Sequence, residues 1–227
     1  MTEETAVRTV QIKEDITSRN NAQAASIRES LIRERIFYLN VMSSPGSGKT
    51  TLITKLLNRL RGDYRIGVIE ADLDSDVDAR AIAQTGVKVI QMHTMGACHI
   101  TCQMSREALD ALGTEDLDVV ILENIGNLVC PAEFDTGAAK NLVLLSLPEG
   151  DDKPLKYPLM FEIASAVAVT KLDTAPAFDF SRDAFRANVH RRNPDAPVFF
   201  VSAVAGDGLD ELESWLRSQI NAVIGRE

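Results

Sequence analysis

The sequence predicts an α/β fold built on a mostly parallel sheet with helices covering both faces. Short runs rich in Val, Ile and Leu alternate along the chain with amphipathic stretches. Most of these runs are almost continuously apolar, which is typical of strands buried on both faces of a parallel sheet. Strands that alternate with helices indicate such a sheet. Ligands of this fold bind where loops leave the carboxyl ends of the strands.

Seven apolar runs and five helical patterns define the predicted elements. The predicted strands span Phe37–Met42, Arg65–Ala71, Val87–Met92, Asp118–Glu123, Asn141–Leu147, Ala166–Thr170 and Val198–Val201. The predicted helices span Thr17–Arg35, Thr51–Leu60, Asp78–Thr85, Cys102–Leu112 and Leu209–Ile224. The first helix has a partly apolar face. We predict a flexible, polar N-terminal arm over residues 1–15 and a single domain over residues 16–227.

Composition restricts the partners and the compartment. The 227 residues carry 24 Lys and Arg against 33 Asp and Glu, and this net charge of −9 argues against a nucleic-acid partner. Three cysteines are too few for a disulfide framework and favour metal or redox roles in a reducing compartment. The N-terminus lacks the apolar core of a signal peptide, and no apolar run reaches the ~20 residues of a membrane span. We expect a cytoplasmic protein that binds no membrane.

A glycine-rich loop follows the first predicted strand and precedes an apolar helix. Its sequence Ser43-Ser-Pro-Gly-Ser-Gly-Lys-Thr50 matches G-x-x-x-x-G-K-[ST], apart from Ser43 in the first glycine position. Glycines let such a loop turn its N–H groups onto phosphate oxygens. Lys49 can reach the β- and γ-phosphates, and Thr50 can hold Mg²⁺. The strand and helix around the loop favour a P-loop NTPase over an ordinary glycine turn. The expected nucleotide contacts are Pro45, Gly46, Ser47, Gly48, Lys49, Thr50 and Thr51.

Carboxylates follow two of the predicted strands. Asp72 comes directly after the second strand, Asp78 opens the following helix, and Glu123 ends the fourth strand. Carboxylates at these places can hold Mg²⁺ or orient the water that attacks a γ-phosphate. Acidic residues are also common at exposed helix starts, which is the alternative for the Asp residues. We expect Thr50, Asp72 and Glu123 to hold Mg²⁺. The expected catalytic set is Lys49, Asp72, Asp78 and Glu123.

A second loop has the pattern of a base-recognition site. Thr170-Lys171-Leu172-Asp173 follows the sixth predicted strand and resembles the [NT]-K-x-D motif of GTPases. The Asp173 carboxylate can accept from guanine N1–H and the exocyclic amine, a pair of donors that adenine lacks. Ser202-Ala203, after the seventh strand, resembles the loop that completes guanine sites. A four-residue pattern is weak by itself, but the two loops in this order favour GTP over ATP.

Cys98, His99 and Cys130 are candidate ligands for a transition metal. They follow the third and fourth predicted strands, so their loops should lie at the nucleotide edge of the sheet. Two thiolates and an imidazole suit Zn²⁺ or Ni²⁺. Alternatively, each cysteine is only a small buried residue. Three ligands would leave a position open for water, another residue or a second subunit. His93 and Cys102 are weaker candidates.

Several sequence blocks together resemble the HypB-type accessory GTPases of [NiFe]-hydrogenase maturation, which have a SIMIBI-like GTPase fold. The matching blocks are Pro45–Thr50, Asp78-Ala79, Cys98-His99, Glu123–Pro131, Glu149–Pro158 and Lys171–Asp173. The likeness extends from about Ala22 to the C-terminus. It implies a GTPase that dimerises on binding GTP and passes nickel, with a partner nickel chaperone, to the hydrogenase large subunit. It also implies that Cys98, His99 and Cys130 bind nickel or zinc near the subunit interface.

The chain departs from this family in three places. The region before the phosphate loop has neither Cys nor His, whereas some members carry a nickel motif or a His-rich tract there, so we expect only the metal site in the GTPase domain. Cys102 stands where the family usually has Ala, and it could alter the metal site. Ser43 stands where glycine is usual.

Three other functions stay open on the sequence alone. An accessory GTPase for another nickel enzyme, such as urease, would share the fold but carry Cys-Pro-His, whereas Cys98 directly precedes His99 here. A second alternative is a P-loop small-molecule kinase. In that case the resemblance of residues 170–173 to the guanine motif would be a coincidence, and the enzyme would usually need an Arg-rich lid. A plain metal buffer would need no nucleotide. No Gln or Arg finger is recognisable, so we expect slow intrinsic GTP hydrolysis.

Overall fold

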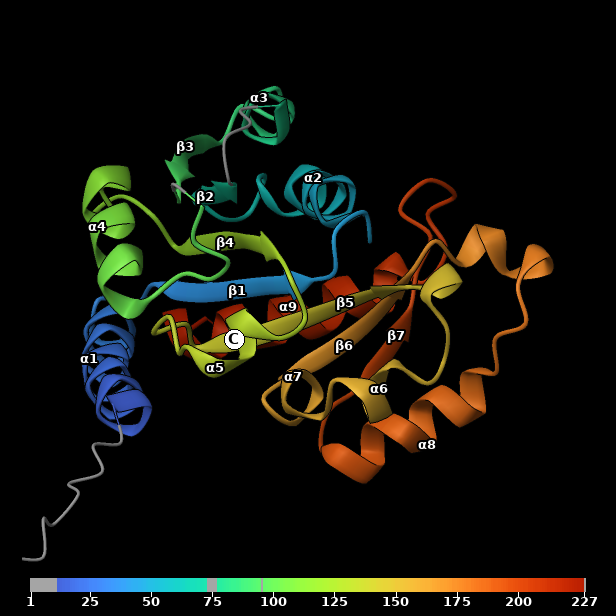
Figure 1. Cartoon of the computed structure of the whole chain (residues 1–227). Coiled ribbons are helices and arrows are strands. Elements are labelled where there is room, and N and C mark those ends of the chain that lie inside the picture. The colour runs from blue at the N-terminus through green and yellow to red at the C-terminus, as the bar shows by residue number, and fades with distance from the viewer. Residues whose placement is uncertain (1–11, 73–76, 95, 227) are drawn as a thin grey trace, which may run out of the picture.

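The fold is a seven-stranded sheet with helices on both faces (Figure 1). The computed structural model describes residues 12–72, 77–94 and 96–226. The strand order is β3-β2-β4-β1-β5-β6-β7, and every neighbouring pair is parallel. The strands are β1 (Phe37–Ser43), β2 (Ile66–Asp72), β3 (Lys88–His93), β4 (Val119–Gly126), β5 (Lys140–Ser146), β6 (Ala166–Thr170) and β7 (Val198–Phe200). The predicted parallel α/β sheet is confirmed.

Two helical layers cover the sheet. The described α-helices are α1 (Ile12–Arg33), α2 (Lys49–Leu60), α3 (Val77–Ala83), α4 (Cys102–Leu112), α5 (Cys130–Glu133), α6 (Lys153–Lys156), α7 (Pro158–Glu162), α8 (Arg182–Arg192) and α9 (Leu209–Ile224). Helices α2, α3 and α9 pack on one face. On the other face, α1 and α4 cover β1, β2 and β4, while α7 and α8 cover β5 and β6 (Figure 1). None of the described helices has the length and apolarity of a membrane span.

Helix α2 fixes the end of the phosphate loop in space. It begins at Lys49, directly after Gly48, and its buried side chains are Leu52, Ile53, Leu56, Leu57 and Leu60. These residues recur at helical spacing and pack against β1 and α9. Because β1 is fully buried in the middle of the sheet and α2 buries its apolar face, the loop between β1 and α2 is held at both ends.

The leading helix starts earlier than its apolar pattern predicts. Helix α1 begins at Ile12, so residues 12–15, which we assigned to the arm, are helical, while residues 1–11 lie outside the described part of the chain. Lys and Glu are good helix formers without being apolar, so a helix can extend beyond its buried face. The division into an arm and a single domain stays a prediction.

Helix α8 was missed because its sequence is dominated by basic residues. Only Phe185 and Val189 are buried in it, so its apolar periodicity is weak. Its N-terminal signal is local: the Ser181 side chain accepts a hydrogen bond from the Ala184 N–H. The short helices α5, α6 and α7, and the 3₁₀ turns η1 (Leu147–Glu149) and η2 (Leu172–Ala177), are likewise too brief for a periodic pattern.

Gly208 provides a test of the packing behind the base loop. It directly precedes α9 as the N-cap residue, with φ +69°. A Cβ at this position would lie 2.0 Å from the Phe200 carbonyl oxygen. We expect Gly208→Ala to lower the free energy of unfolding by about 2–4 kcal/mol through backbone strain and a clash. Gly62→Ala is the matched control, because open space surrounds Gly62. Urea unfolding measures both variants, and equal midpoints would contradict this geometry.

Candidate nucleotide and metal site

The phosphate loop has the backbone that its glycines predict. Gly46 and Gly48 have φ values of +72° and +89°, which favour glycine over any other residue. Ser43 instead belongs to β1, where it pairs with Gly126 and Leu144, and its hydroxyl donates to the Ser44 carbonyl at 2.7 Å. Position 43 therefore needs no glycine, and the departure from the common motif leaves the loop geometry intact.

Two side chains from the end of β6 bind carbonyls of the phosphate loop. The Thr170 hydroxyl donates to the Ser47 carbonyl at 2.5 Å, and the Lys171 ammonium donates to the Gly46 carbonyl at 2.7 Å. Lys171 adopts the left-handed conformation with φ 57°, which turns the chain sharply after β6. The expected base-recognition loop thus lies against the phosphate loop, although 125 residues of sequence separate Lys171 from Gly46.

The two expected base-recognition segments also bind each other. The buried Ser202 hydroxyl donates to Asp173 Oδ1 at 2.5 Å, and the Leu172 N–H donates to the Val201 carbonyl at 3.1 Å. Asp173 itself is exposed, and Ala203 is half-buried beside Ser202. The structure therefore brings Lys171, Asp173 and Ser202 to the rim of the phosphate loop.

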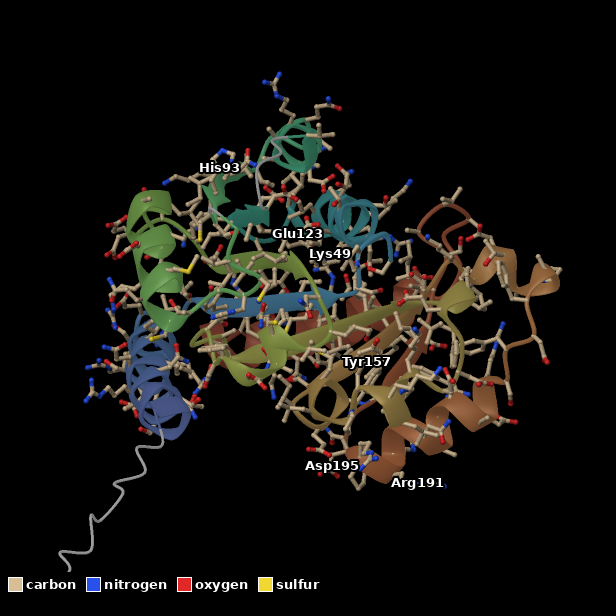
Figure 2. All side chains as sticks on the ribbon, in the orientation of Figure 1. Lys49, His93, Glu123, Tyr157, Arg191 and Asp195 are labelled. Carbon is tan, nitrogen blue, oxygen red and sulfur yellow. The ribbon has the colours of Figure 1, made fainter. Side chains whose placement is uncertain are left out.

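Thr50 and Glu123 meet at the expected magnesium position. The Thr50 hydroxyl donates to Glu123 Oε1 at 2.7 Å, while Glu123 Oε2 is buried and has no hydrogen-bond partner among the described groups. Burial raises the pKa of Glu123 to about 7, and the nearby Lys49 opposes this rise. Figure 2 shows Lys49 and Glu123 together where β4 approaches α2. Carboxylate and hydroxyl oxygens are the ligands that Mg²⁺ prefers, so these residues fit it.

Glu70 is a buried acid beside this position that sequence reasoning missed. It pairs in register with Glu123 across β2 and β4 and is 2% exposed. Burial raises its pKa to about 8, assisted by the charges of Glu123, Asp72 and Asp78 and opposed by Lys49. Asp72 and Asp78 also raise the pKa of Glu123, so the same two Asp residues act on both buried Glu residues. The sequence signal that could have identified Glu70 is an acidic residue inside the otherwise apolar run of β2.

Gly126 and Glu149 contact the outer part of the phosphate loop. A Cβ on Gly126 would lie 3.0 Å from Pro45 Cα, so only glycine permits this approach of β4. The Glu149 carboxylate accepts hydrogen bonds from the Ser44 hydroxyl and, at 2.7 Å, from the Ser146 N–H. The block that begins at Glu149 was singled out only by family resemblance. Its first residue is now seen to anchor the phosphate loop.

The thiols of Cys98 and Cys130 are neighbours. A hydrogen bond between them raises the pKa of Cys130. The Cys98 sulfur lies 3.7 Å from His99 Nδ1, and the His99 ring stacks on Phe134 at 3.8 Å. Burial lowers the pKa of His99. No three His, Cys, Asp or Glu side chains in the described residues are arranged to hold a metal ion, so the three-ligand set stays a prediction.

Cys102 and His93 do not join this pair. Cys102 is 2% exposed, and its thiol donates to Gln23 Oε1 of α1 at 3.0 Å. Burial raises its pKa, as expected for a structural cysteine. His93 is exposed at the end of β3, and Figure 2 shows it apart from Lys49 and Glu123. Neither residue extends the candidate metal site within the described chain.

The buried acids predict that the magnesium-free protein loses stability as pH rises. Between about pH 4.5 and pH 8 the unfolded chain releases protons that folded Glu70 and Glu123 retain, so stability falls with pH. Glu70→Gln should flatten this fall, whereas Glu211→Gln, at an exposed position, should not. Urea midpoints in EDTA at pH 5.5 and 8 measure the effect. Equal slopes for Glu70→Gln and the parent would contradict the prediction.

Known proteins share this sequence over most of its length. The CobW/HypB/UreG nucleotide-binding domain matches residues 38–200. Over 215 residues the chain is 43% identical to hydrogenase maturation factor HypB of Azotobacter chroococcum, covering 95% of this chain and 70% of that protein. Over 211 residues it is 41% identical to hydrogenase/urease maturation factor HypB of Helicobacter pylori, covering 91% of this chain and 86% of that protein.

Solved structures agree with the sequence comparison. HypB from Helicobacter pylori in complex with nickel superposes with a TM-score of 0.84 at 39% identity, covering 90% of this chain and 96% of that one. The signal recognition particle receptor FtsY from Elizabethkingia anophelis, in complex with GDP, has a TM-score of 0.55 at 16% identity over 94% of this chain and 78% of its own, and shows the fold alone. The P-loop GTPase fold predicted from the sequence is confirmed. The chain belongs to the HypB family of maturation factors, within the CobW/HypB/UreG nucleotide-binding group.

Proposed function

We propose that this protein is a GTP-hydrolysing nickel metallochaperone that assists metal insertion into the [NiFe]-hydrogenase large subunit through GTP-dependent dimerisation. One observation carries the proposal: a single segment joins the phosphate loop to the thiol pair. Glu123 binds Thr50, Gly126 lies against Pro45, and Cys130 follows directly. The Asn127 side chain accepts hydrogen bonds from the N–H groups of Val129 and Cys130 at 2.7 and 3.3 Å. These bonds fix the turn from Asn127 to Cys130.

The nucleotide end of this segment supports hydrolysis of GTP. The amides of the phosphate loop and Lys49 would hold the β- and γ-phosphates for in-line attack by water. Thr50, Asp72 and Glu123 would hold Mg²⁺, which when bound neutralises charge on the transferred phosphoryl group. Asp78 lies close enough to act on the charge of Glu123 and is our candidate for orienting water. No Gln or Arg finger is recognisable in the sequence, which predicts slow intrinsic turnover.

The base loop supports GTP over ATP. Asp173, fixed by Ser202, presents a carboxylate at the rim of the phosphate loop, where guanine offers two donors. Two further hydrogen bonds hold the same loop on the phosphate loop, which supports a functional role for its motif. This arrangement, together with the family, disfavours the small-molecule kinase.

The thiol end supports transfer of nickel as cargo. Cys98 is exposed and Cys130 is half-buried, so the pair is reachable from solvent. Two sulfurs and one nitrogen would leave one position of a four-coordinate site open, and a second copy of the chain related by two-fold symmetry could fill it. His99 would supply a nitrogen ligand after leaving its stack on Phe134. An ion held by two copies couples metal binding to dimerisation. The same donors suit Zn²⁺.

The recipient enzyme is proposed from the relatives. The protein from Azotobacter chroococcum is named for hydrogenase maturation, and the one from Helicobacter pylori for both hydrogenase and urease. Urease is therefore the second candidate recipient. Cys98 directly followed by His99, without an intervening proline, favours hydrogenase. A partner nickel chaperone and the hydrogenase large subunit are the partners that we propose.

Asp173→Asn tests the base assignment. The amide donates where the carboxylate accepts, so we expect GTP affinity to fall by about tenfold or more and xanthosine triphosphate affinity to rise. Isothermal titration calorimetry with GTP, ATP and xanthosine triphosphate measures these changes in affinity. Asp179→Asn is a control at another exposed aspartate after β6. Equal affinities of the parent for ATP and GTP would contradict the assignment.

Size-exclusion chromatography with metal analysis tests the whole function. With a non-hydrolysable GTP analogue and Ni²⁺, we expect a dimer that carries stoichiometric nickel. Cys98→Ala with Cys130→Ala should abolish the bound metal, and Cys102→Ala should retain it, because the Cys102 thiol faces Gln23.

Lys49→Ala separates the GTPase from a plain metal buffer in the same experiment. Loss of the phosphate contact should remove the effect of the analogue on dimerisation. A metal buffer predicts the same metal content and the same oligomer for Lys49→Ala and the parent in the presence of the analogue. Nickel retained after loss of both Cys98 and Cys130 would contradict the assigned metal site.

A further inference from the structure

Helix α1 contacts both loops that carry the thiol pair, and one of its buried side chains, Asn20, contacts both at once. Asn20 is 6% exposed. Its Oδ1 accepts from the Cys102 N–H at 2.9 Å, and its Nδ2 donates to the Asp135 carbonyl at 2.8 Å. Cys102 ends the loop that carries Cys98 and His99, and Asp135 follows the short helix that begins at Cys130. One amide group therefore bridges the two loops.

Both bonds of Asn20 go to backbone groups, one in each loop. The Cys102 N–H belongs to the first turn of α4, whose N–H groups have no acceptor within the helix. Thr101 caps this turn by accepting from the Met104 N–H, and Asn20 adds a second acceptor from another helix. An amide accepts through its oxygen and donates through its nitrogen, so it can serve the two loops with two separate atoms, whereas a carboxylate only accepts and Ala does neither.

Neighbouring residues hold α1 rigidly at this place. Arg28 binds both carboxylate oxygens of Asp135 at 2.7 and 2.6 Å and donates to the Ala138 carbonyl at 2.8 Å. A Cβ on Gly137 would lie 2.8 Å from the Ile27 side chain, so the loop lies directly on the helix. Figure 1 shows α1 and α4 side by side at one end of the sheet, with α5 beside them.

The two loops are joined by three successive contacts. The thiols of Cys98 and Cys130 form the first, and the stacked rings of His99 and Phe134 form the second. The Asn20 amide forms the third contact, between Cys102 at the end of one loop and Asp135 in the other. The first two contacts would change when His99 and the thiols take up a metal, whereas the Asn20 bridge can persist.

We propose that Asn20 is a positioning residue for the candidate metal site, and that α1 serves as the frame that sets the separation of Cys98 and Cys130. This inference rests on the proposed metal-carrying function for its biological meaning, but the separation of the two thiols can be measured without metal. Asn20 touches neither metal nor nucleotide and acts through the two loops. The guanine and phosphate contacts, which lie on β1, α2 and β6, do not depend on it.

Disulfide formation between Cys98 and Cys130 in a metal-free glutathione redox buffer measures their effective concentration. Two thiols lose two protons and two electrons to oxidised glutathione, and mass mapping of peptides quantifies the bond. We expect Asn20→Ala to lower this effective concentration about tenfold, in keeping with the loss of two hydrogen bonds. The affinity for Ni²⁺ should fall about tenfold as well, and the affinity for GTP should stay that of the parent.

Two controls separate positioning from general loss of stability. Asn21→Ala removes an exposed amide from the next position of α1 and should change none of the three quantities. Leu31→Ala removes a core side chain, 6% exposed, from the same helix without touching the bridge. It should lower the unfolding midpoint but leave the thiol equilibrium unchanged.

The outcomes are distinct. An unchanged thiol equilibrium in Asn20→Ala, or an equal change in Leu31→Ala, would overturn the positioning role. A parent protein that binds no Ni²⁺ through Cys98 and Cys130, but whose thiol equilibrium falls in Asn20→Ala alone, would remove the proposed cargo function and leave the positioning role in place.

Discussion

The position of β4 in the middle of a parallel sheet is the constraint on which the rest of the site depends. Its neighbours β1 and β2 place Thr50 and Glu70 on either side of Glu123. The carboxyl ends of parallel strands share one edge, so segments from distant parts of the sequence meet there. The close approach of Gly126 to Pro45 then directs the chain toward Cys130. A shift of β4 by one residue would move Glu123 to the opposite face of the sheet.

The same edge concentrates negative charge around a single lysine. Asp72 and Asp78 raise the pKa of both Glu70 and Glu123, while Lys49 lowers both and the Thr50 hydroxyl also lowers that of Glu123. Burial and the neighbouring acids make Glu70 and Glu123 hold protons near neutral pH, and a bound cation would displace those protons. A magnesium ion would satisfy the buried Glu123 oxygen that lacks a partner. The electrostatic arrangement of an otherwise apolar sheet edge thus favours a divalent cation together with phosphate.

Local patterns predicted most of the fold and part of the site. The strands and long helices were predicted because buried parallel strands are continuously apolar and α2, α4 and α9 are amphipathic. Lys49, Thr50 and Glu123 followed from the motif and its place between elements. The roles of Glu70, Glu149 and Asn20 could not be predicted, because each depends on a partner far away in sequence. Helix α8 was missed because basic residues obscure its two buried positions.

The hydrogen bonds from Thr170 and Lys171 to the phosphate loop also orient the backbone amides of that loop. A trans peptide unit is planar, so its N–H points opposite to its C=O. Binding the carbonyls of Gly46 and Ser47 from the β6 side therefore turns the amides of Ser47 and Gly48 the other way, into the concavity of the loop. The dipoles are aligned during folding, before any anion arrives, and little ordering entropy remains to be lost on association. If the 170–173 loop recognises guanine as proposed, the same loop would also orient the amides that bind the phosphates, so base selectivity and phosphate binding would depend on one set of contacts.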